Sequence, residues 1–191
     1  MNEPAPKLAT AADLAALGEG RYEVIAGKVV EKAAPSFEHS DAQLDGGTFL
    51  RARFHHGGGG DGGPGGWWIV TECEIELEAH EVYRPDLVGW RRSRVPERPT
   101  GRPVTARPDW VCEILSPSNA RTDLVDKLRA YQRAKVPHYG IADPVQQVLT
   151  VDRYGNGTYE VALTAGREET VNAEPFDAVP FPVAVFFGAE P

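Results

Sequence analysis

The spacing of apolar residues changes several times along the chain, and each change predicts a different element. Apolar runs of strand length, bounded by turn residues, predict β-strands. They cover residues 21–25, 28–32, 67–77, 83–90, 109–115, 138–142, 147–153 and 158–164. Helical spacing predicts helices over residues 10–17, 37–54 and 122–135. This order of elements predicts a domain that mixes helices and strands.

Turn residues set the limits of several predicted elements. Ala26-Gly27 joins the first two strands in a tight hairpin, and Tyr154-Gly155-Asn156-Gly157 joins the last two. Residues 55–66 are rich in glycine and predict a flexible loop rather than a phosphate-binding loop. An apolar stretch at residues 179–187, interrupted by prolines, closes the pattern.

One charged residue interrupts the most apolar of these runs. Residues 109–115 read as a central strand covered on both faces, and Glu113 is the only charge in its interior. An ionised carboxylate that loses its water needs a cation or several hydrogen bonds in return. Glu113 is therefore a candidate for a functional residue.

The helix predicted at residues 122–135 places a lysine near that carboxylate. At 100° per residue, Leu124, Leu128 and Tyr131 share one face and form the expected buried stripe. Lys127 lies at the border of this stripe. Its methylenes can lie on the core while its ammonium reaches the end of the neighbouring strand.

Composition narrows the class of protein. A chain of 191 residues with 41% apolar content suffices for one domain, which we expect to span residues 1–191 with its core at about 20–165. Cys73 and Cys112 lack the spacing of a zinc site and predict buried thiols in a reducing compartment. With no signal peptide and no apolar run of membrane length, the chain predicts a soluble, cytoplasmic protein.

The charge distribution limits where a nucleic acid would bind. The net charge of −8 argues against a surface that binds nucleic acid everywhere, because phosphate contacts come from lysine and arginine. A local basic segment occupies the loop at residues 91–107. Its arginines are Arg91, Arg92, Arg94, Arg98, Arg102 and Arg107. This loop is a candidate for DNA contacts, and a solvated loop that balances charge is the alternative.

Asp86, Glu113 and Lys127 together match the needs of metal-dependent phosphodiester hydrolysis. Asp86 and Glu113 lie on successive predicted strands, and neighbouring strands are about 4.8 Å apart. Mg²⁺ or Mn²⁺ takes oxygen ligands, usually one or two carboxylates with water and phosphate. Lys127 would orient the attacking water and stabilise charge on the phosphate. Each residue taken singly also fits a structural role.

These residues resemble those of the PD-(D/E)XK nuclease superfamily, and more closely the bacterial Uma-type family of restriction-endonuclease-like proteins. The matching segments, in order, are YEVIAGKV (22–29), PSFEH (35–39), RPD (84–86), EILSPS (113–118), DLVDKLRAY (123–131) and VPHY (136–139). The resemblance implies an α/β (α+β) fold, a restriction-endonuclease-like mixed β-sheet flanked by helices, with an added N-terminal hairpin and C-terminal strands. It also implies Mg²⁺-dependent cleavage of phosphodiester bonds in DNA and, in many members, a homodimer.

The resemblance implies roles for individual residues. Asp86 and Glu113 become metal ligands, and Lys127 becomes the catalytic lysine. The superfamily pattern places its lysine two residues after the acid, where Leu115 stands in this chain. The lysine has therefore moved onto the helix, as it does in the Uma-type family.

Two further residues match family positions. Glu23 falls on an early acidic position, where it helps to hold metal or water, and a simple hairpin charge is the alternative. His39 matches a histidine near the start of the first long helix, and a structural histidine is the alternative. Gly46-Gly47 departs from the family pattern and predicts a weakened middle of that helix.

Three functions remain open from the sequence. The first is a metal-dependent endonuclease that acts on DNA. The second is a non-catalytic module that binds nucleic acid or a protein with the same surface, because fold and activity separate readily. The third is a metal-dependent hydrolase of a small phosphate ester, which the acidic net charge suits better than it suits a protein that binds duplex DNA.

Overall fold

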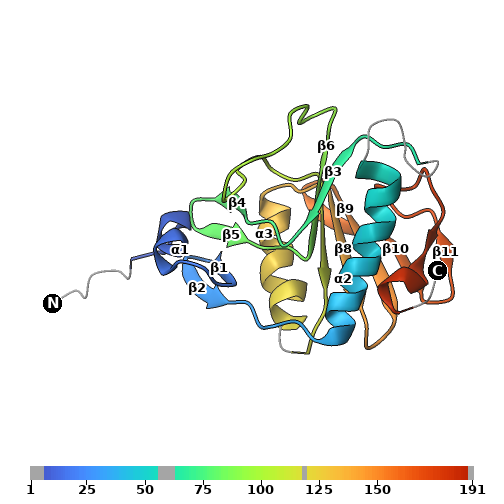
Figure 1. The fold of residues 1–191 in the computed structure, drawn as a ribbon, viewed down its shortest axis with the longest axis horizontal. Helices are drawn as coiled ribbons and strands as arrows, with labels where there is room; N and C mark the ends of the chain where they lie inside the picture. The colour runs from blue at the N-terminus through green and yellow to red at the C-terminus, as the bar shows by residue number, and fades with distance from the viewer. Residues whose placement is uncertain (1–6, 56–62, 118–119, 189–191) are drawn as a thin grey trace.

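The fold has a central sheet with helices on both faces. The computed structural model describes residues 7–55, 63–117 and 120–188, so most of the flexible loop predicted at residues 55–66 lies outside the described residues. Helix α2 (Phe37–Leu50) packs on one face of the sheet and helix α3 (Leu128–Arg133) on the other (Figure 1). No helix in the described ranges has the length and apolar character needed to cross a membrane.

The central sheet has the strand order β10-β9-β8-β7-β6-β3. Its strands are β3 (Trp67–Thr71), β6 (Leu87–Arg91), β7 (Trp110–Ile114), β8 (His138–Asp143), β9 (Val148–Gly155) and β10 (Thr158–Gly166). Strands β7 and β8 are parallel and are connected through α3 and the π-helix η3 (Thr122–Lys127). The other neighbouring pairs are antiparallel. This is the mixed sheet flanked by helices that the resemblance implied.

A smaller sheet has the order β2-β1-β5-β4. Its strands are β1 (Tyr22–Ile25), β2 (Lys28–Glu31), β4 (Ile75–Glu78) and β5 (Glu81–Tyr83). The N-terminal hairpin turns at Ala26 and Gly27, whose φ angles of 50° and 74° lie in the left-handed region. Helix α1 (Ala11–Leu17) covers the sheet by packing Leu14 against Val24.

Two strands predicted as continuous are divided between the two sheets. Residues 67–77 form β3 and β4, and residues 83–90 form the end of β5 and most of β6. The chain leaves the central sheet at Glu72, which has a φ of 52°. The apolar alternation continues through Cys73 and Ile75 at the first crossing, and at the second it is interrupted only by Arg84, Pro85 and Asp86, so neither break was predicted. Asp86 lies at the second crossing, where the two sheets meet.

The glycines in the middle of α2 are packing positions. A Cβ at Gly46 would overlap the ring of Phe186, and a Cβ at Gly47 would lie 3.2 Å from Leu87. Helix α2 is unbroken at these residues and continues into the π-helix η1 (Arg51–His55). The two glycines therefore let the helix approach its neighbours closely, at the cost in helix stability that the sequence predicted.

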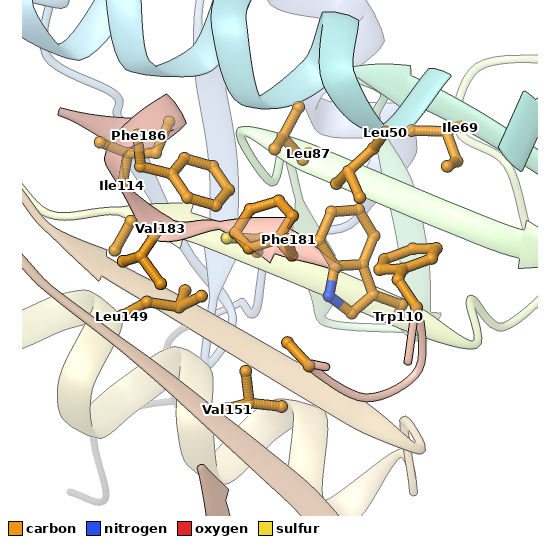
Figure 2. Packing of buried hydrophobic residues seen from close by; sticks show 14 of the residues in the cluster. Leu50, Ile69, Leu87, Trp110, Ile114, Leu149, Val151, Phe181, Val183 and Phe186 are labelled. Carbon is orange, nitrogen blue, oxygen red and sulfur yellow. The ribbon is translucent and has the colours of Figure 1, made fainter. Parts of the chain in front are cut away.

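The C-terminal segment completes the core under α2. It contains β11 (Thr170–Val171), β12 (Phe181–Pro182) and the 3₁₀ helix η4 (Val183–Phe186). Figure 2 shows Phe181 and Phe186 packed in the same cluster as Trp110 and Leu149. The ring centroid of Phe181 lies 5.0 Å from that of Phe49 and 5.5 Å from that of Phe186. The predicted apolar stretch at residues 179–187 thus closes one face of the central sheet.

The buried face of the η3–α3 helix differs from the predicted stripe. Leu124 is 44% exposed, whereas Asp123, Lys127 and Tyr131 are buried. These three residues recur every four positions, a spacing that the wider π-helical turn brings onto one face. The prediction for Leu124 was wrong because the helix buries the ion pair of Asp123 with Lys127 in place of an apolar side chain.

Candidate active site

The two predicted metal ligands lie side by side at one end of the central sheet. Asp86 immediately precedes β6, and Glu113 is the fourth residue of β7, which is antiparallel to β6. The backbone N–H of Ile114 donates a hydrogen bond to Asp86 Oδ2 at 2.7 Å, which fixes this carboxylate against the end of β7. Both carboxylates are 1% exposed.

Lys127 stands among three carboxylates in what we call the Glu113 half of the cluster: Glu23, Glu113, Asp123, Lys127 and Tyr131. Its Nζ lies 3.0 Å from Glu113 Oε1, 3.2 Å from Glu23 Oε1 and 3.2 Å from Asp123 Oδ1. The Tyr131 hydroxyl donates to the same Glu113 oxygen at 2.8 Å. Strands from both sheets and one helix therefore meet at a single ammonium group.

The Asp86 half of the cluster comprises Asp86, Lys32, His39, Glu72 and Arg21. Lys32 Nζ donates to Asp86 Oδ1 at 2.7 Å and to Glu72 Oε1 at 3.0 Å. His39 Nε2 lies 3.2 Å from Asp86 Oδ1. Arg21 binds Glu72 at 2.8 Å at the outer side. The hairpin, the start of α2 and the crossing between the sheets build this half.

Burial and local charge act in opposite directions in the Asp86 half. Burial raises the pKa of Asp86, but the hydrogen bond with His39 and the charge of Lys32 outweigh burial and hold that pKa below its ordinary value of 3.8. Burial lowers the pKa of Lys32, but the carboxylates of Asp86 and Glu113 outweigh it and raise that pKa. Asp86 and Lys32 are therefore both charged at neutral pH.

Burial prevails at the carboxylate of the Glu113 half. It raises the pKa of Glu113 to about 8 against the attraction of Lys127, and the neighbouring Asp123 carboxylate adds to the rise. Burial would lower the pKa of Lys127, but the carboxylates of Glu113, Glu23 and Asp123 outweigh it and raise that pKa well above its ordinary value. One ammonium among three buried carboxylates thus stays charged, while Glu113 holds a proton near neutral pH.

The donor chemistry of the cluster fits a hard divalent cation. Within the described residues, the side chains joined by these ion pairs are five carboxylates and three cations, so one negative charge is in excess when Glu113 holds its proton and two when it is ionised. No three His, Cys, Asp or Glu side chains of the described residues are placed to hold a metal by themselves. Asp86 and Glu113 therefore suit Mg²⁺ or Mn²⁺, which complete their coordination with water and phosphate, and do not suit a closed zinc site.

The structure brings the sequence candidates Asp86, Glu113, Lys127, Glu23 and His39 into this one cluster. It adds Lys32, Glu72 and Asp123, which the sequence reasoning missed as site residues. The pairing of Asp123 with Lys127 at i,i+4 was a signal that a search for helical ion pairs would have found. Lys32 gave no such signal, because its partners come from sequence positions 40 and 54 residues away.

The arginine-rich loop leaves the sheet at the other end of β6. Arg91 ends this strand and Asp86 precedes its start, so roughly 16 Å of extended chain separates them. Several arginines of the loop are held by contacts within the fold. Arg91 and Arg92 stack on Trp67 and Trp68, Arg94 pairs with Asp109, and Arg102 pairs with Glu74. The structure does not bring the loop arginines to the acidic cluster.

Comparison with known proteins supports the fold and shows the family. A crystal structure titled as a "putative nuclease belonging to DUF820" from Anabaena variabilis is similar with a TM-score of 0.71 and 20% sequence identity, over 94% of this chain and 97% of that chain. No curated protein matches the sequence. The family model Uma2, described as "Putative restriction endonuclease", matches residues 11–183. Because this match spans nearly the whole chain, the protein belongs to the Uma2 family.

Proposed function

We propose that this protein is a Mg²⁺- or Mn²⁺-dependent endonuclease that hydrolyses phosphodiester bonds in DNA. The observation that carries the proposal is the contact of Lys127 with Glu113 beside Asp86, in a buried cluster where carboxylates outnumber cations. The nuclease description of the Uma2 family supports the same reaction class. The geometry corresponds to two oxygen ligands with an adjacent ammonium.

Each residue of the cluster has a distinct task in this function. Asp86 and Glu113 would hold the cation, which when bound neutralises charge on the phosphate and lowers the pKa of water. Lys127 would orient the attacking water and stabilise charge on the phosphate. Glu23 positions Lys127, and its Oε1 also accepts a hydrogen bond from the Arg84 N–H at 2.8 Å.

The substrate needs a route to these buried groups. Asp86, Glu113 and Lys127 are each no more than 2% exposed, so the scissile phosphate reaches them only when a covering segment moves. Residues 33–36 lead into α2 and are exposed, as are Pro117 after β7 and Arg121 before η3. The phosphate would enter between these segments, which flank His39, Glu113 and Asp123 in the chain.

The arginine-rich loop would bind the DNA backbone away from the scissile phosphate. Arg91 lies too far from Asp86 along β6 to act at the reacting atoms. The loop instead suits phosphate contacts further along the same duplex. Arg91 and Arg98 are exposed. Replacing both with Gln should weaken DNA binding and lower the salt slope by about one unit for each lost phosphate contact. An enzyme for a small phosphate ester would keep its activity in this variant.

Cleavage of supercoiled plasmid tests the proposal. The wild type should nick or linearise DNA with Mg²⁺ or Mn²⁺ and remain inactive with EDTA. Asp86→Ala and Lys127→Ala should each lose on the order of 10²–10³ in rate. Asp126→Asn is the matched control, because it changes a carboxylate of the same helix outside the cluster and should cleave like the wild type.

Two results would reject the proposal. Equal cleavage by the wild type, Asp86→Ala and Lys127→Ala would identify a contaminating nuclease. If the wild type cuts no DNA offered, and if the wild type and Asp86→Ala bind DNA equally well, the protein is the non-catalytic module instead.

A further inference from the structure

Lys32 occupies a position built from oxygen atoms. Its Nζ donates to Asp86 Oδ1 at 2.7 Å, to Glu72 Oε1 at 3.0 Å and to the carbonyl oxygen of Arg84 at 2.7 Å. The side chain is 4% exposed. Two carboxylates and a backbone carbonyl are also the kinds of ligand that hard cations take in proteins. The ammonium therefore stands where the fold has assembled a cation site.

The oxygens of Asp86 are already engaged in this arrangement. Oδ1 accepts from Lys32 and lies 3.2 Å from His39 Nε2, while Oδ2 accepts from the Ile114 N–H. The Ile114 N–H is fixed by the strand, but Lys32 reaches Asp86 through a flexible four-carbon side chain. A divalent cation that binds Asp86 would meet the Lys32 charge within a few ångströms, and the ammonium is the donor that can withdraw.

The surroundings of Lys32 also leave polar atoms without partners. Within the described residues, Glu72 Oε2, His39 Nδ1 and Arg84 Nε are buried and make no hydrogen bond. Each belongs to a residue that contacts Lys32 or Asp86. Buried polar groups are normally satisfied, and unsatisfied ones gather where a ligand or a second arrangement completes the bonding. Of the three, Glu72 Oε2 belongs to a carboxylate that binds the ammonium directly, and it is a further oxygen ligand for a cation at this position.

We propose that Lys32 is a tethered counter-ion that holds Asp86, Glu72 and the Arg84 carbonyl together and competes with a divalent cation for Asp86. The inference rests on the proposed function only in taking Asp86 as a metal ligand. Lys32 is a positioning residue that keeps the Asp86 side of the cluster assembled without metal. Metal binding displaces its ammonium from Oδ1, so the lysine weakens the apparent metal affinity.

Calorimetric titration with MnCl₂ tests the competition without any activity assay. The proteins are the wild type, Lys32→Met and the control Lys28→Met, which removes an exposed lysine from the same hairpin. Because a nearby positive charge is removed, Lys32→Met should bind Mn²⁺ at least about tenfold more tightly. Lys28→Met should match the wild type. Equal or weaker binding by Lys32→Met overturns the proposal.

A second set of variants separates this inference from the proposed function. The double variant Lys32→Met, Asp86→Asn should lose the gain in affinity. If the wild type binds Mn²⁺, Asp86→Asn does not, and Lys32→Met binds no more tightly than the wild type, only the counter-ion inference fails. If none of the proteins binds Mn²⁺, the metal-dependent function fails as well.

Thermal unfolding gives an independent readout. Loss of Lys32 leaves Asp86 buried without its ammonium partner and Glu72 with Arg21 alone, so Lys32→Met should unfold at a lower temperature than the wild type in EDTA. Mn²⁺ should raise the unfolding temperature of Lys32→Met by more than that of the wild type. An equal rise in both contradicts the proposal. If Lys32→Met is unfolded without metal, Lys32→Gln is titrated instead, because its uncharged amide still donates hydrogen bonds. Lys32→Gln should also bind Mn²⁺ more tightly than the wild type.

Discussion

The two halves of the buried cluster hold their carboxylates under different electrostatic conditions. In the Asp86 half, the carboxylates of Asp86 and Glu72 face two cations, Lys32 and Arg21. In the Glu113 half, three carboxylates share Lys127. Counted over the side chains that the structure describes, the first half has as many cations as carboxylates, and in the second half the carboxylates outnumber the cations by two.

Equal burial therefore leads to opposite protonation. Asp86 and Glu113 are both 1% exposed, yet the pKa of Asp86 is held below its ordinary value and burial raises that of Glu113 to about 8. His39 and Lys32 stabilise the ionised form of Asp86, whereas the Asp123 carboxylate adds to burial in opposing the ionisation of Glu113. A permanently ionised Asp86 gives the site a fixed anchor, while the Glu113 half stays short of positive charge until a cation arrives.

The largest expected effect comes from removing the cation of the Glu113 half. Lys127→Met should lower the free energy of unfolding by about 3–5 kcal/mol, because three buried carboxylates lose their partner. Urea denaturation at pH 7 in EDTA measures this loss. Arg129→Met is the control, since it removes an exposed cation two residues later. A loss no greater than that of the control would show that Lys127 does not balance the cluster.

The next effect contrasts the two carboxylates at pH 7. Asp86→Asn should cost about 2–3 kcal/mol of unfolding free energy, because Lys32 loses its ionised partner and the Ile114 N–H its charged acceptor. Glu113→Gln should cost less than about 1 kcal/mol, because the amide replaces a carboxyl group that already holds a proton. Denaturation of both variants under the same conditions measures the difference. Equal losses would mean that Glu113 is ionised and that the two halves do not differ.

The pH dependence of stability tests the Glu113 half more directly. The pKa of Glu113 is about 8 in the fold and 4.5 ordinarily, so the folded protein binds more protons between these values. The stabilisation that comes from this extra proton on Glu113 is complete below pH 4.5 and is lost as the pH rises to about 8. Its size is on the order of 1.4 kcal/mol for each unit by which the two pKa values differ. Denaturation between pH 5 and 9 in EDTA should show the decline in the wild type. Glu113→Gln should flatten it, and an unchanged slope would assign the proton to another group.

The sequence predicted more of the Glu113 half than of the Asp86 half. A lone charge in an apolar strand and a lysine on the next helix are local signals, and both residues were placed from them. Lys32 and Glu72 join Asp86 only because two sheets meet, and the apolar pattern ran through the crossing at Glu72 without a break. Contacts between residues distant in the chain leave no periodic trace, so the counter-ion of Asp86 was not predictable.

Contacts between distant parts of the chain also explain why the prediction for Leu124 was wrong. A period of 3.6 residues assigns Leu124 to the core, but the buried face of η3–α3 follows Asp123, Lys127 and Tyr131. Apolar periodicity assumes that buried positions are apolar. It fails where a helix contributes charged residues to a buried cluster of ion pairs, which is the condition expected at a functional site.

The smallest expected effect concerns a single hydroxyl in the Glu113 half. The Tyr131 hydroxyl donates to Glu113 Oε1 at 2.8 Å, and such a bond favours the ionised carboxylate. Tyr131→Phe should therefore cost about 1 kcal/mol and move the pH-dependent loss of stability to higher pH. Tyr139→Phe is a matched control, because it also removes a buried hydroxyl, but one that donates to the backbone carbonyl of Asp123 at 3.0 Å. Its cost should be similar and its pH midpoint unchanged. Equal midpoints in the two variants would show that Tyr131 does not help to set the charge of Glu113.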